Sequence, residues 1–318
     1  MGPDRVASLP MYDFPELRGA HDAFWAALSA RLEAAGVSNV PPALTRNLPH
    51  GDVWRHPSLL FAQGCEYPLA TSFADHVRLV ATPMYSAVGC EGARYRSAIV
   101  VRGAGAGPDA GGGMRGAGGG MRGAGGGMPG AGGGMPGAGG VVPGAGVDGG
   151  LGAGRALADF RGQRCAINGL DSNSGMNLLR AAVAPLATGG RFFSSVVVSG
   201  SHLRSVEMVA AGEADVAAID CVSFAHFQRL YPSVVGQLRI LGWTPSGPSL
   251  PFITARSASD ATVRTLRCAL ADVFDDDGLA AVREQLLLNG VDLQPTEGFA
   301  DVLALERRAV EEGYPAIG

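Results

Sequence analysis

Hydroxyl and glycine residues gather in one short segment, residues 168–175, between an apolar run and a stretch with helical periodicity. Ser172, Asn173, Ser174 and Gly175 therefore lie at the start of a predicted helix. The first N–H groups of a helix lack intrahelical acceptors, and its dipole places about half a positive charge there. The segment therefore favours a phosphate, phosphonate or carboxylate. The alternative is an ordinary N-cap, in which a Ser or Asp side chain accepts from the helix's own amides.

Further polar residues follow the ends of other predicted strands. They are Tyr12, Gln63 with Gly64, His202 and Asp220. In open sheets built from alternating strands and helices, ligands lie beyond the carboxyl ends of the strands. We therefore expect these residues to line one site. The alternatives are that His202 caps a helix and that Asp220 is a buried carboxylate paired with an arginine.

The composition excludes several classes of function. The chain has 318 residues, 47% of them hydrophobic, which is enough for a large core and suggests two domains. Its net charge of −4, without a basic stripe, argues against a nucleic-acid partner. The sequence contains no lysine, which excludes a pyridoxal Schiff base and the Walker lysine of P-loop enzymes. We expect no cofactor.

The five cysteines show no CxxC pair, so the sequence predicts neither a zinc site nor a disulfide framework. Cys65 and Cys90 both fall in turn-like segments and could pair if the protein is exported. No run approaches the roughly 20 apolar residues that cross a membrane, so we expect no membrane insertion. The first residues enter a strand almost at once and leave no room for a signal peptide, which keeps a cytoplasmic location open.

Residues 103–150 hold about half of the 49 glycines and repeat GGGMxGA every seven residues. Glycine loses the most entropy on ordering and offers no side chain to pack, so this tract predicts a flexible surface insertion. The alternative is a tether or interaction segment that uses the repeated methionines.

Outside this tract the chain alternates between strands and helices, a rhythm typical of parallel sheets covered on both faces. The predicted strands cover residues 5–9, 43–48, 59–62, 77–82, 95–101, 164–167, 193–199, 216–219, 238–242 and 252–255. The predicted helices cover 17–35, 258–274, 279–288 and 299–312, and one more follows each of the three strands that begin at 164, 193 and 216.

Several segments together resemble a known family. LADFRGQRCAIN, DSNSGMNLLRAAVAPL and VVVSGSHLRSVEMVAAGEADVAAIDC are similar to the second lobe of type II periplasmic binding proteins, specifically the phosphate and phosphonate solute-binding components of ABC transporters. MYDFPEL, FAQGCEYPL and LRILGWTPSGPSLPFIT resemble the same family. The resemblance covers nearly the whole chain except residues 103–150.

The resemblance implies an α/β fold with two lobes, mainly parallel sheets flanked by helices, and two crossing hinge strands. Lobe one would comprise residues 1–97 and 243–318, and lobe two residues 98–242 with the insertion at 103–150. It also implies non-catalytic binding of a small anion between the lobes, a partner ABC permease, a monomer, and a periplasmic or cell-envelope location.

By the same resemblance, Ser172, Ser174 and Gly175 match the oxyanion-binding helix start, and His202 matches a cleft residue at the next strand end. Asp220 matches an acidic residue that faces an amino group in phosphonate binders. Tyr12 and Gln63, the latter followed by Gly64, match strand ends of the first lobe that close over the ligand, and Asn173 belongs to the same predicted ligand set.

Two other functions stay open at this point. An enzyme on the same fold could use Cys65, His202 and Asp220 as nucleophile, base and orienting group, although nothing in their spacing requires it. Cys65 follows Gly64 in a predicted turn rather than at a helix start, where its pKa would fall. A cytosolic sensor domain is the third hypothesis, but no helix-turn-helix signal precedes the first strand.

Overall fold

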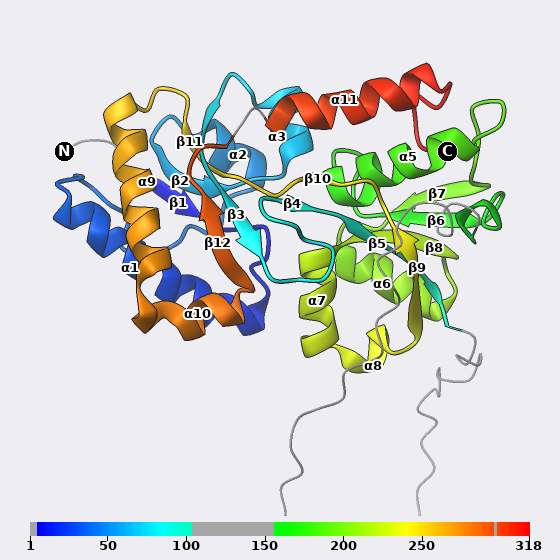
Figure 1. Ribbon diagram of the computed structural model, residues 1–318, viewed down its shortest axis with the longest axis horizontal. Helices are drawn as coiled ribbons and strands as arrows, with labels where there is room; N and C mark the ends of the chain where they lie inside the picture. Colours follow the sequence, from blue (N-terminus) through cyan, green and yellow to red (C-terminus); the bar gives the residue numbers. More distant parts are fainter. Residues whose placement is uncertain (1–4, 104–155, 296–297) are drawn as a thin grey trace, which may run out of the picture.

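The computed structural model describes residues 5–103, 156–295 and 298–318, so the predicted insertion at 103–150 lies almost wholly outside the described residues. These residues form two lobes, each built around its own sheet (Figure 1). In the described part of the chain, the sheet of lobe one contains five strands in the order β1-β2-β11-β3-β12. Their bounds are β1 Val6–Ser8, β2 Leu59–Gln63, β3 Val77–Tyr85, β11 Phe252–Ala255 and β12 Leu288–Asp292.

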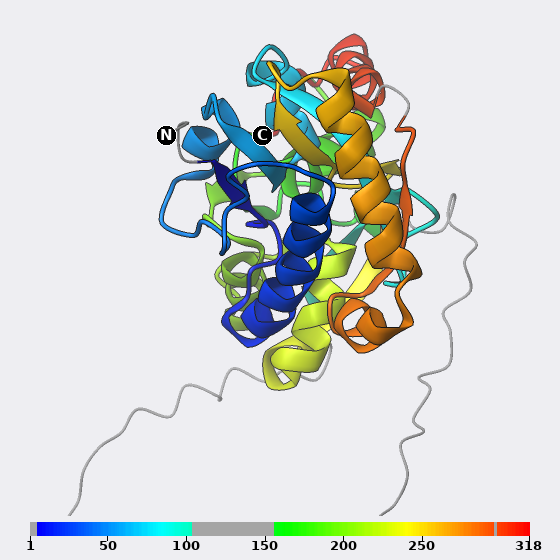
Figure 2. The same ribbon diagram turned by 90° about the vertical axis from the view of Figure 1, so that its left-hand side faces the viewer.

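Helices cover both faces of this first sheet. Figure 2 shows α1 and α9 side by side over one face, and α1 also contacts α10. The helical segments of lobe one are η1 Pro15–Leu17, α1 Arg18–Ala34, α2 His50–Arg55, α3 Glu66–Ser72, α9 Asp260–Asp275, η4 Asp277–Leu279 and α10 Ala280–Gln285.

Lobe two has the same construction. Its described strands form a sheet in the order β7-β6-β8-β5-β9, with bounds β5 Ser97–Arg102, β6 Arg164–Ile167, β7 Ser195–Val198, β8 Val216–Asp220 and β9 Leu238–Trp243. Its helical segments are η2 Asn173–Asn177, α5 Leu178–Val183, η3 Ala184–Leu186, α6 His202–Ala211, α7 Cys221–Leu230 and α8 Pro232–Val235.

The burial of the strands explains why the sequence pattern predicts them. In β8 every residue is buried, and alternate side chains enter separate apolar clusters on the two faces of the sheet: Val216 and Ala218 on one, Ala217 and Ile219 on the other. A strand covered on both faces must be apolar throughout, which is why it appears as a continuous apolar run.

Both sheets are mixed rather than mainly parallel. β1 with β2, and β6 with β7 and β8, run parallel, whereas β11, β12, β5 and β9 all enter antiparallel to their neighbours. In lobe two β5, the first strand after the chain leaves lobe one, is antiparallel to both of its neighbours, and in lobe one so is β11, the first strand after the chain returns.

The lobes are joined by two antiparallel strands, β4 Arg94–Tyr95 and β10 Gly247–Pro248. A third connection is α11, Gly298–Glu311, which runs along one side of the molecule from lobe one to lobe two (Figure 1) and packs on both α3 and α5. The chain end then contacts lobe two, where the Gly318 carbonyl accepts from the N–H groups of Phe192 and Phe193 at 2.8 and 3.0 Å. The lobe boundaries at residues 97 and 243 stay a prediction.

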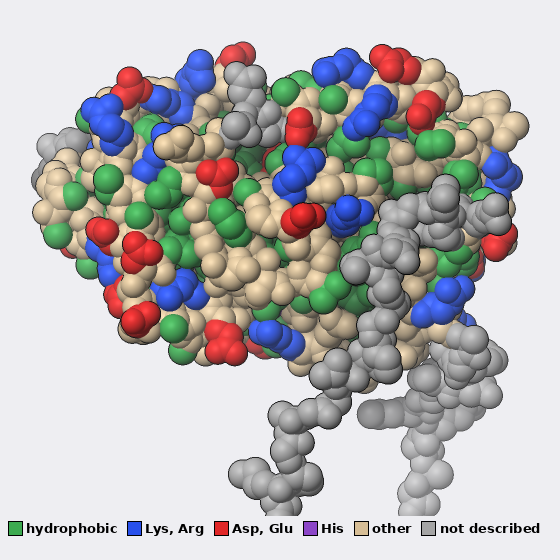
Figure 3. Space-filling model, in the orientation of Figure 1, with side chains coloured by type: hydrophobic (Ala, Val, Ile, Leu, Met, Phe, Trp, Pro, Cys, Tyr) green, Lys and Arg blue, Asp and Glu red, His purple; other side chains and the backbone are tan. Residues whose placement is uncertain are grey.

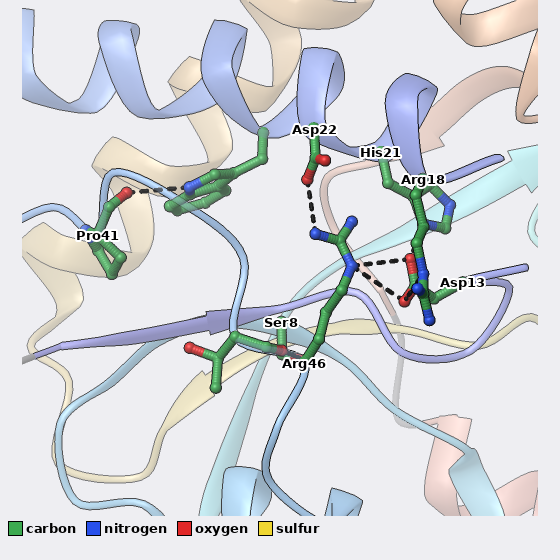
Figure 4. A network of polar contacts seen from close by, with 9 residues as sticks. Ser8, Asp13, Arg18, His21, Asp22, Pro41 and Arg46 are labelled. Carbon is green, nitrogen blue, oxygen red and sulfur yellow. Dashed lines mark hydrogen bonds and ion pairs between the residues drawn. The ribbon is translucent and has the colours of Figure 1, made fainter. Parts of the chain in front are cut away.

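The strand predicted at residues 43–48 is absent from the structure, and this expectation was wrong. The segment makes only isolated bonds to β1, such as Thr45 N–H to the Ala7 carbonyl at 2.7 Å. Its conformation is set instead by Arg46, whose guanidinium contacts Asp13 at 3.0 Å and Asp22 at 2.8 Å (Figure 4). Ion pairs in a loop have no signature in hydrophobic periodicity.

The predicted helix at 279–288 was also wrong at its end. Helix α10 stops at Gln285, Leu287 takes a left-handed φ of 58°, and β12 begins at Leu288. The sequence pattern missed β12, α2 and α3 because all three are short and lie beside turn residues.

Candidate functional site

The predicted anion site starts at Ser172, directly before η2. The Ser172 hydroxyl accepts from the Gly175 N–H at 3.0 Å, so Ser172 is an N-cap in the ordinary sense. The Ser174 hydroxyl lies 3.4 Å from it, and both side chains are buried. Ser172 therefore caps the turn, and of the two serines only Ser174 has its hydroxyl directed at a side chain outside this turn.

That partner is His202, the first residue of α6. Its Nε2 lies 2.8 Å from the Ser174 hydroxyl, while Ser201 caps the helix. Capping by His202 is thus ruled out. Burial lowers the pKa of His202 to about 4, so the imidazole is neutral at pH 7 and carries one N–H donor. The pair is therefore uncharged, and one of its two protons is already engaged in the bond between the two side chains.

Gly175 is required at its position by close packing. A Cβ there would lie 1.9 Å from Oδ1 of Asn168 and 3.3 Å from the His202 ring. Asn168 Oδ1 is itself buried without a hydrogen-bond partner. The absence of a side chain at Gly175 therefore lets the end of β6 and the start of α6 meet at the serine turn.

Lobe one meets this site through Tyr12, which follows β1. The Tyr12 hydroxyl donates to Oδ2 of Asp220 at 3.1 Å, and both side chains are buried. This bond joins residues 208 positions apart in sequence and links the two lobes directly. Burial, and then the charge of Asp220, raise the pKa of the Tyr12 hydroxyl well above its usual value, so it stays a donor.

Asp220 ends β8 and caps α7, with Oδ1 accepting from the Ser223 N–H at 2.8 Å. Burial raises the pKa of Asp220 to about 6, although its hydrogen bonds oppose this. At neutral pH it is a largely ionised carboxylate held by two neutral donors, Tyr12 and Ser223. The alternative, a buried pairing of Asp220 with an arginine, is not formed, and a cationic group beside Asp220 would be strongly favoured.

Gln63 and Gly64 organise lobe one rather than face lobe two. The Gln63 amide donates to the Tyr85 hydroxyl at 2.8 Å and to the Leu250 carbonyl at 3.0 Å. Gly64 donates its N–H to the Pro251 carbonyl, and a Cβ there would lie 2.8 Å from Leu69. Tyr85 in turn stacks edge-on against Tyr12, so Gln63 acts on the cleft through these two tyrosines.

Asn173 lies at the centre of the contact between the lobes. Its side chain donates to the Tyr95 hydroxyl at 3.2 Å and accepts from Asn177 at 3.0 Å, and it is fully buried. Its backbone N–H points to Cys65 Sγ at 3.5 Å. Asn173 therefore holds the serine turn against the β4 crossing strand and α3.

An ion-pair network fixes the turn that carries Tyr12. Asp13, the next residue, accepts from Arg46 and from Arg18 and lies 3.5 Å from His21 (Figure 4). Although partial burial opposes it, hydrogen bonds from His21 and Arg46 hold the pKa of Asp13 below its usual value. The loop that replaces the strand predicted at 43–48 thus positions the turn that carries Tyr12.

Sequence reasoning missed Glu66, the first residue of α3. Both carboxyl oxygens are buried without a hydrogen-bond partner, and the side chain is 1% exposed. Burial raises the pKa of Glu66 well above its usual value, and Asp220 adds to the shift. The available signal was an acidic residue at the start of a helix two positions after Gly64, which the pattern had assigned to a turn.

Within the described ranges, two cavities lie close to some of these residues. One of about 20 Å³, room for roughly one water, lies beside Tyr12, Gln63 and Tyr85. The other, of about 350 Å³, has a lining that includes Glu66, Thr82, Arg94, Ser249, Asp292 and Asp301. Arg94 is already paired with Asp301 at 2.7 Å. Neither of these two cavities is lined by Ser174 or His202.

Cys65 is a helix N-cap residue, because α3 starts at Glu66, and the expectation of a turn there was wrong. Its pKa is nevertheless raised to about 12 by burial and by the neighbouring charge of Glu66. An attacking cysteine needs a thiolate, and this thiol stays protonated at neutral pH. Cys65 contacts Asn173 rather than His202, so the geometry does not assemble the nucleophile and base of the enzyme hypothesis.

Comparison with known families identifies the chain. Residues 58–294 match the family described as the periplasmic substrate-binding protein of phosphonate ABC transporters. The chain belongs to this family. The resemblance inferred from the sequence is thereby confirmed, as is the role of solute binding for an ABC uptake system. No curated protein sequence matches the chain significantly.

Solved structures confirm the two-lobed fold. XAC2383 from Xanthomonas citri, bound to chloride ion, is 12% identical with a TM-score of 0.62 over 97% of this chain and 98% of that chain. PA3383 of Pseudomonas aeruginosa, a binding protein component of an ABC phosphonate transporter, is 14% identical with a TM-score of 0.62 over 98% and 88%. PhnD1 from Prochlorococcus marinus, in complex with methylphosphonate, is 10% identical with a TM-score of 0.62 over 98% and 100%.

The surface of the protein carries both positively and negatively charged side chains. On the face shown in Figure 3, the described arginine and carboxylate side chains are interspersed and form no continuous basic patch. Across the described ranges, no helix combines the length and the apolar character that a membrane crossing requires. The same residues hold no group of three or more His, Cys, Asp or Glu side chains arranged for a metal ion.

Proposed function

We propose that this substrate-binding protein takes a small organophosphonate that carries an amino group, with the phosphonate at Ser174 and His202 and the amine beside Asp220. The observation that carries the proposal is the division of the cleft. Lobe two supplies uncharged donors at one point and, at another, a buried carboxylate that only neutral groups hold.

Uncharged donors suit the anionic end of the ligand. The Ser174 hydroxyl and a neutral His202 can hydrogen-bond phosphonate oxygens, and the start of η2 adds N–H groups and a favourable dipole. The described part of the cleft places no arginine beside this pair, so orientation of neutral dipoles, rather than an ion pair, supports binding here. Asn173 and Gly175 keep the turn in place.

The acidic side of the cleft suits an amine. Asp220 is ionised and buried, and Glu66 adds two unpartnered carboxyl oxygens in the same electrostatic environment. A cationic amine relieves the cost of burying this charge, whereas an inorganic dianion meets repulsion. Tyr12 would close over the ligand from lobe one.

The proposal includes opening and closing of the two lobes during ligand binding. The bond between Tyr12 and Asp220 and the buried position of Asn173 belong to a closed arrangement, so the lobes must separate to admit ligand and close to exclude water. We propose a monomer that works in the periplasm with an ABC permease, that its lobes divide at residues 97 and 243, and that it has no catalytic activity.

The test is isothermal titration calorimetry with methylphosphonate, 2-aminoethylphosphonate, phosphate and methanesulfonate. We expect 2-aminoethylphosphonate to bind best. Ser174→Ala should weaken both phosphonates by roughly 10-fold or more, because a hydrogen bond to a charged group contributes about 1.5–3 kcal/mol. Asp220→Asn should weaken only the amino compound. Ser29→Ala, on the exposed face of α1, is the matched control and should change neither.

Equal affinity of wild type and Ser174→Ala for both phosphonates would refute the anion site. Equal affinity of wild type and Asp220→Asn for 2-aminoethylphosphonate would refute the amine site. Conversion of any bound phosphonate to a product would refute the non-catalytic assignment.

A further inference from the structure

Two cysteines that are far apart in the sequence meet beside the crossing strands. Cys90 lies in the segment between β3 and β4, and Cys221 is the first residue of α7 in lobe two. Their sulfur atoms are 3.3 Å apart. The sequence suggested Cys65 as the partner of Cys90, but Cys65 Sγ instead faces the backbone of Asn173.

The backbone holds both cysteines in this position. Cys90 donates its N–H to the Ala87 carbonyl at 3.0 Å, and Cys221 donates to the Arg96 carbonyl at 3.2 Å. Gly89 has a φ of +104°, and a Cβ there would lie 2.6 Å from Trp243 and 3.0 Å from the Cβ of Cys221. The turn before Cys90 is therefore packed closely against the start of α7 and the end of β9.

We propose that Cys90 and Cys221 are a disulfide site that ties lobe one to lobe two when the protein meets an oxidising disulfide. The existing sulfur separation requires an approach of little more than 1 Å to reach the S–S bond length of about 2.05 Å. Side-chain rotation supplies such a movement without separating the segments that carry the two cysteines.

The two cysteines react with the oxidising disulfide in a defined order because they differ in solvent access. Cys90 is partly exposed, whereas Cys221 is buried. The Cys90 thiolate attacks a disulfide RSSR, forms a mixed disulfide and releases RS⁻. The Cys221 thiolate then attacks the Cys90 sulfur and releases the second RS⁻. The balance is two protein thiols and RSSR giving one protein disulfide and two RSH.

The bond would have a structural consequence at the cleft. Cys221 follows Asp220, whose carboxylate accepts from Tyr12 of lobe one. A bond at Cys221 closes a chain loop of more than 100 residues, which restricts the unfolded state strongly. We expect the oxidised protein to melt roughly 5–10 °C higher than the reduced protein.

Tryptic peptide mapping tests the proposal, because arginine is the only cleavage residue and the sequence places each cysteine on its own peptide. The peptides are 56–78 with Cys65, 79–94 with Cys90, 165–180 with Cys165, 205–229 with Cys221 and 268–283 with Cys268. The folded full chain is incubated with glutathione disulfide, unfolded, alkylated and digested without reduction.

We expect a linked pair of peptides 79–94 and 205–229, with the other three cysteines alkylated. Cys221→Ser and Cys90→Ser should lose the linked pair and the rise in melting temperature, while Cys268→Ser, at an exposed thiol, should keep both. A link between Cys65 and Cys90, or alkylation of all five cysteines after oxidation, would overturn the proposal. A linked protein with an unchanged melting temperature would overturn the tether between the lobes. The ligand does not enter this test, so its outcome is independent of the proposed function.

Discussion

Replacing Asp220 by Asn should make the ligand-free protein more stable at neutral pH while removing the proposed amine site. The buried carboxylate accepts from Ser223 N–H through Oδ1 and from the Tyr12 hydroxyl through Oδ2. An asparagine keeps the Oδ1 acceptor, and its amide can donate to the tyrosine oxygen. The substitution therefore removes the charge with little loss of hydrogen bonding.

The size of the effect follows from the pKa. Burial raises the pKa of Asp220 from 3.8 to about 6. A raised folded-state pKa favours the protonated form, so its stabilising contribution is complete below the unfolded pKa near 4 and is lost as pH rises through 6. About two pKa units at roughly 1.4 kcal/mol each give a cost of ~3 kcal/mol for the ionised side chain above pH 6.

Urea unfolding of wild type and Asp220→Asn between pH 4 and pH 8 tests this reasoning. The difference in unfolding free energy should be near zero at pH 4, rise in favour of the variant, and level off above pH 6.5. The difference between the two proteins cancels carboxyl groups that do not interact with Asp220, whereas Glu66, whose pKa the charge of Asp220 helps to raise, contributes to the measured difference. A pH-independent difference, or a variant less stable than wild type at pH 7.5, would contradict the buried-charge argument.

Asp215→Asn is the matched control at the other end of β8. Hydrogen bonds from Arg164 lower the pKa of Asp215. A lowered folded-state pKa gives stability that is present above the unfolded pKa and is lost as pH falls. This variant should therefore be less stable than wild type at pH 7.5, and the gap should close towards acid pH, the opposite of Asp220→Asn.

Three further predictions concern the support of the site. Gly175→Ala places a Cβ 1.9 Å from Asn168 Oδ1, so it should lower the unfolding free energy in urea by about 1–3 kcal/mol and abolish methylphosphonate binding. The control Gly19→Ala, with open space around it, should leave the unfolding free energy unchanged or raise it slightly. Equal behaviour of the two variants would contradict the packing argument. Arg180→Ala leaves the buried Asn177 amide oxygen and the part-buried Pro315 carbonyl without their guanidinium donor and should lower the unfolding free energy by about 3 kcal/mol. A loss below 1 kcal/mol would show that the contact is replaceable. Asp13→Asn should lower the unfolding free energy above pH 4, because the lowered pKa of this carboxyl gives stability that is lost as pH falls. The melting temperature of the variant should therefore fall less steeply than that of wild type as the pH is lowered. The same fall in both proteins would refute this prediction.

Helices and strands with a regular pattern of burial were predictable from the sequence. The predicted strands 164–167 and 252–255 have the observed bounds, and α1 and α9 differ from prediction by only one or two residues at each end. All are long helices or strands of which at least three residues in four are buried. The segment at 43–48 failed because its apolar residues are isolated and its conformation depends on Arg46 reaching Asp13 and Asp22, which periodicity cannot show.

The candidate site was likewise predictable only in part from the sequence. The rule that ligands lie at strand ends selected Ser174, His202, Tyr12 and Asp220, and the structure brings the first two and the last two into hydrogen-bond contact. Their role in ligand binding stays a proposal. Glu66 was missed because its burial depends on how α3 packs.

The sequence by itself determined the alternation of buried strands and helices, the polar residues at the strand ends, and the family. These properties follow from local spacing, because burial repeats along a strand or a helix with a fixed period. The tertiary structure decided which of those residues meet. Tyr12 with Asp220 and Cys90 with Cys221 are pairs separated by more than 100 residues, and only the packing of one lobe against the other sets their distances. The same packing excludes water from Asp220 and His202, and so moves their pKa values in opposite directions.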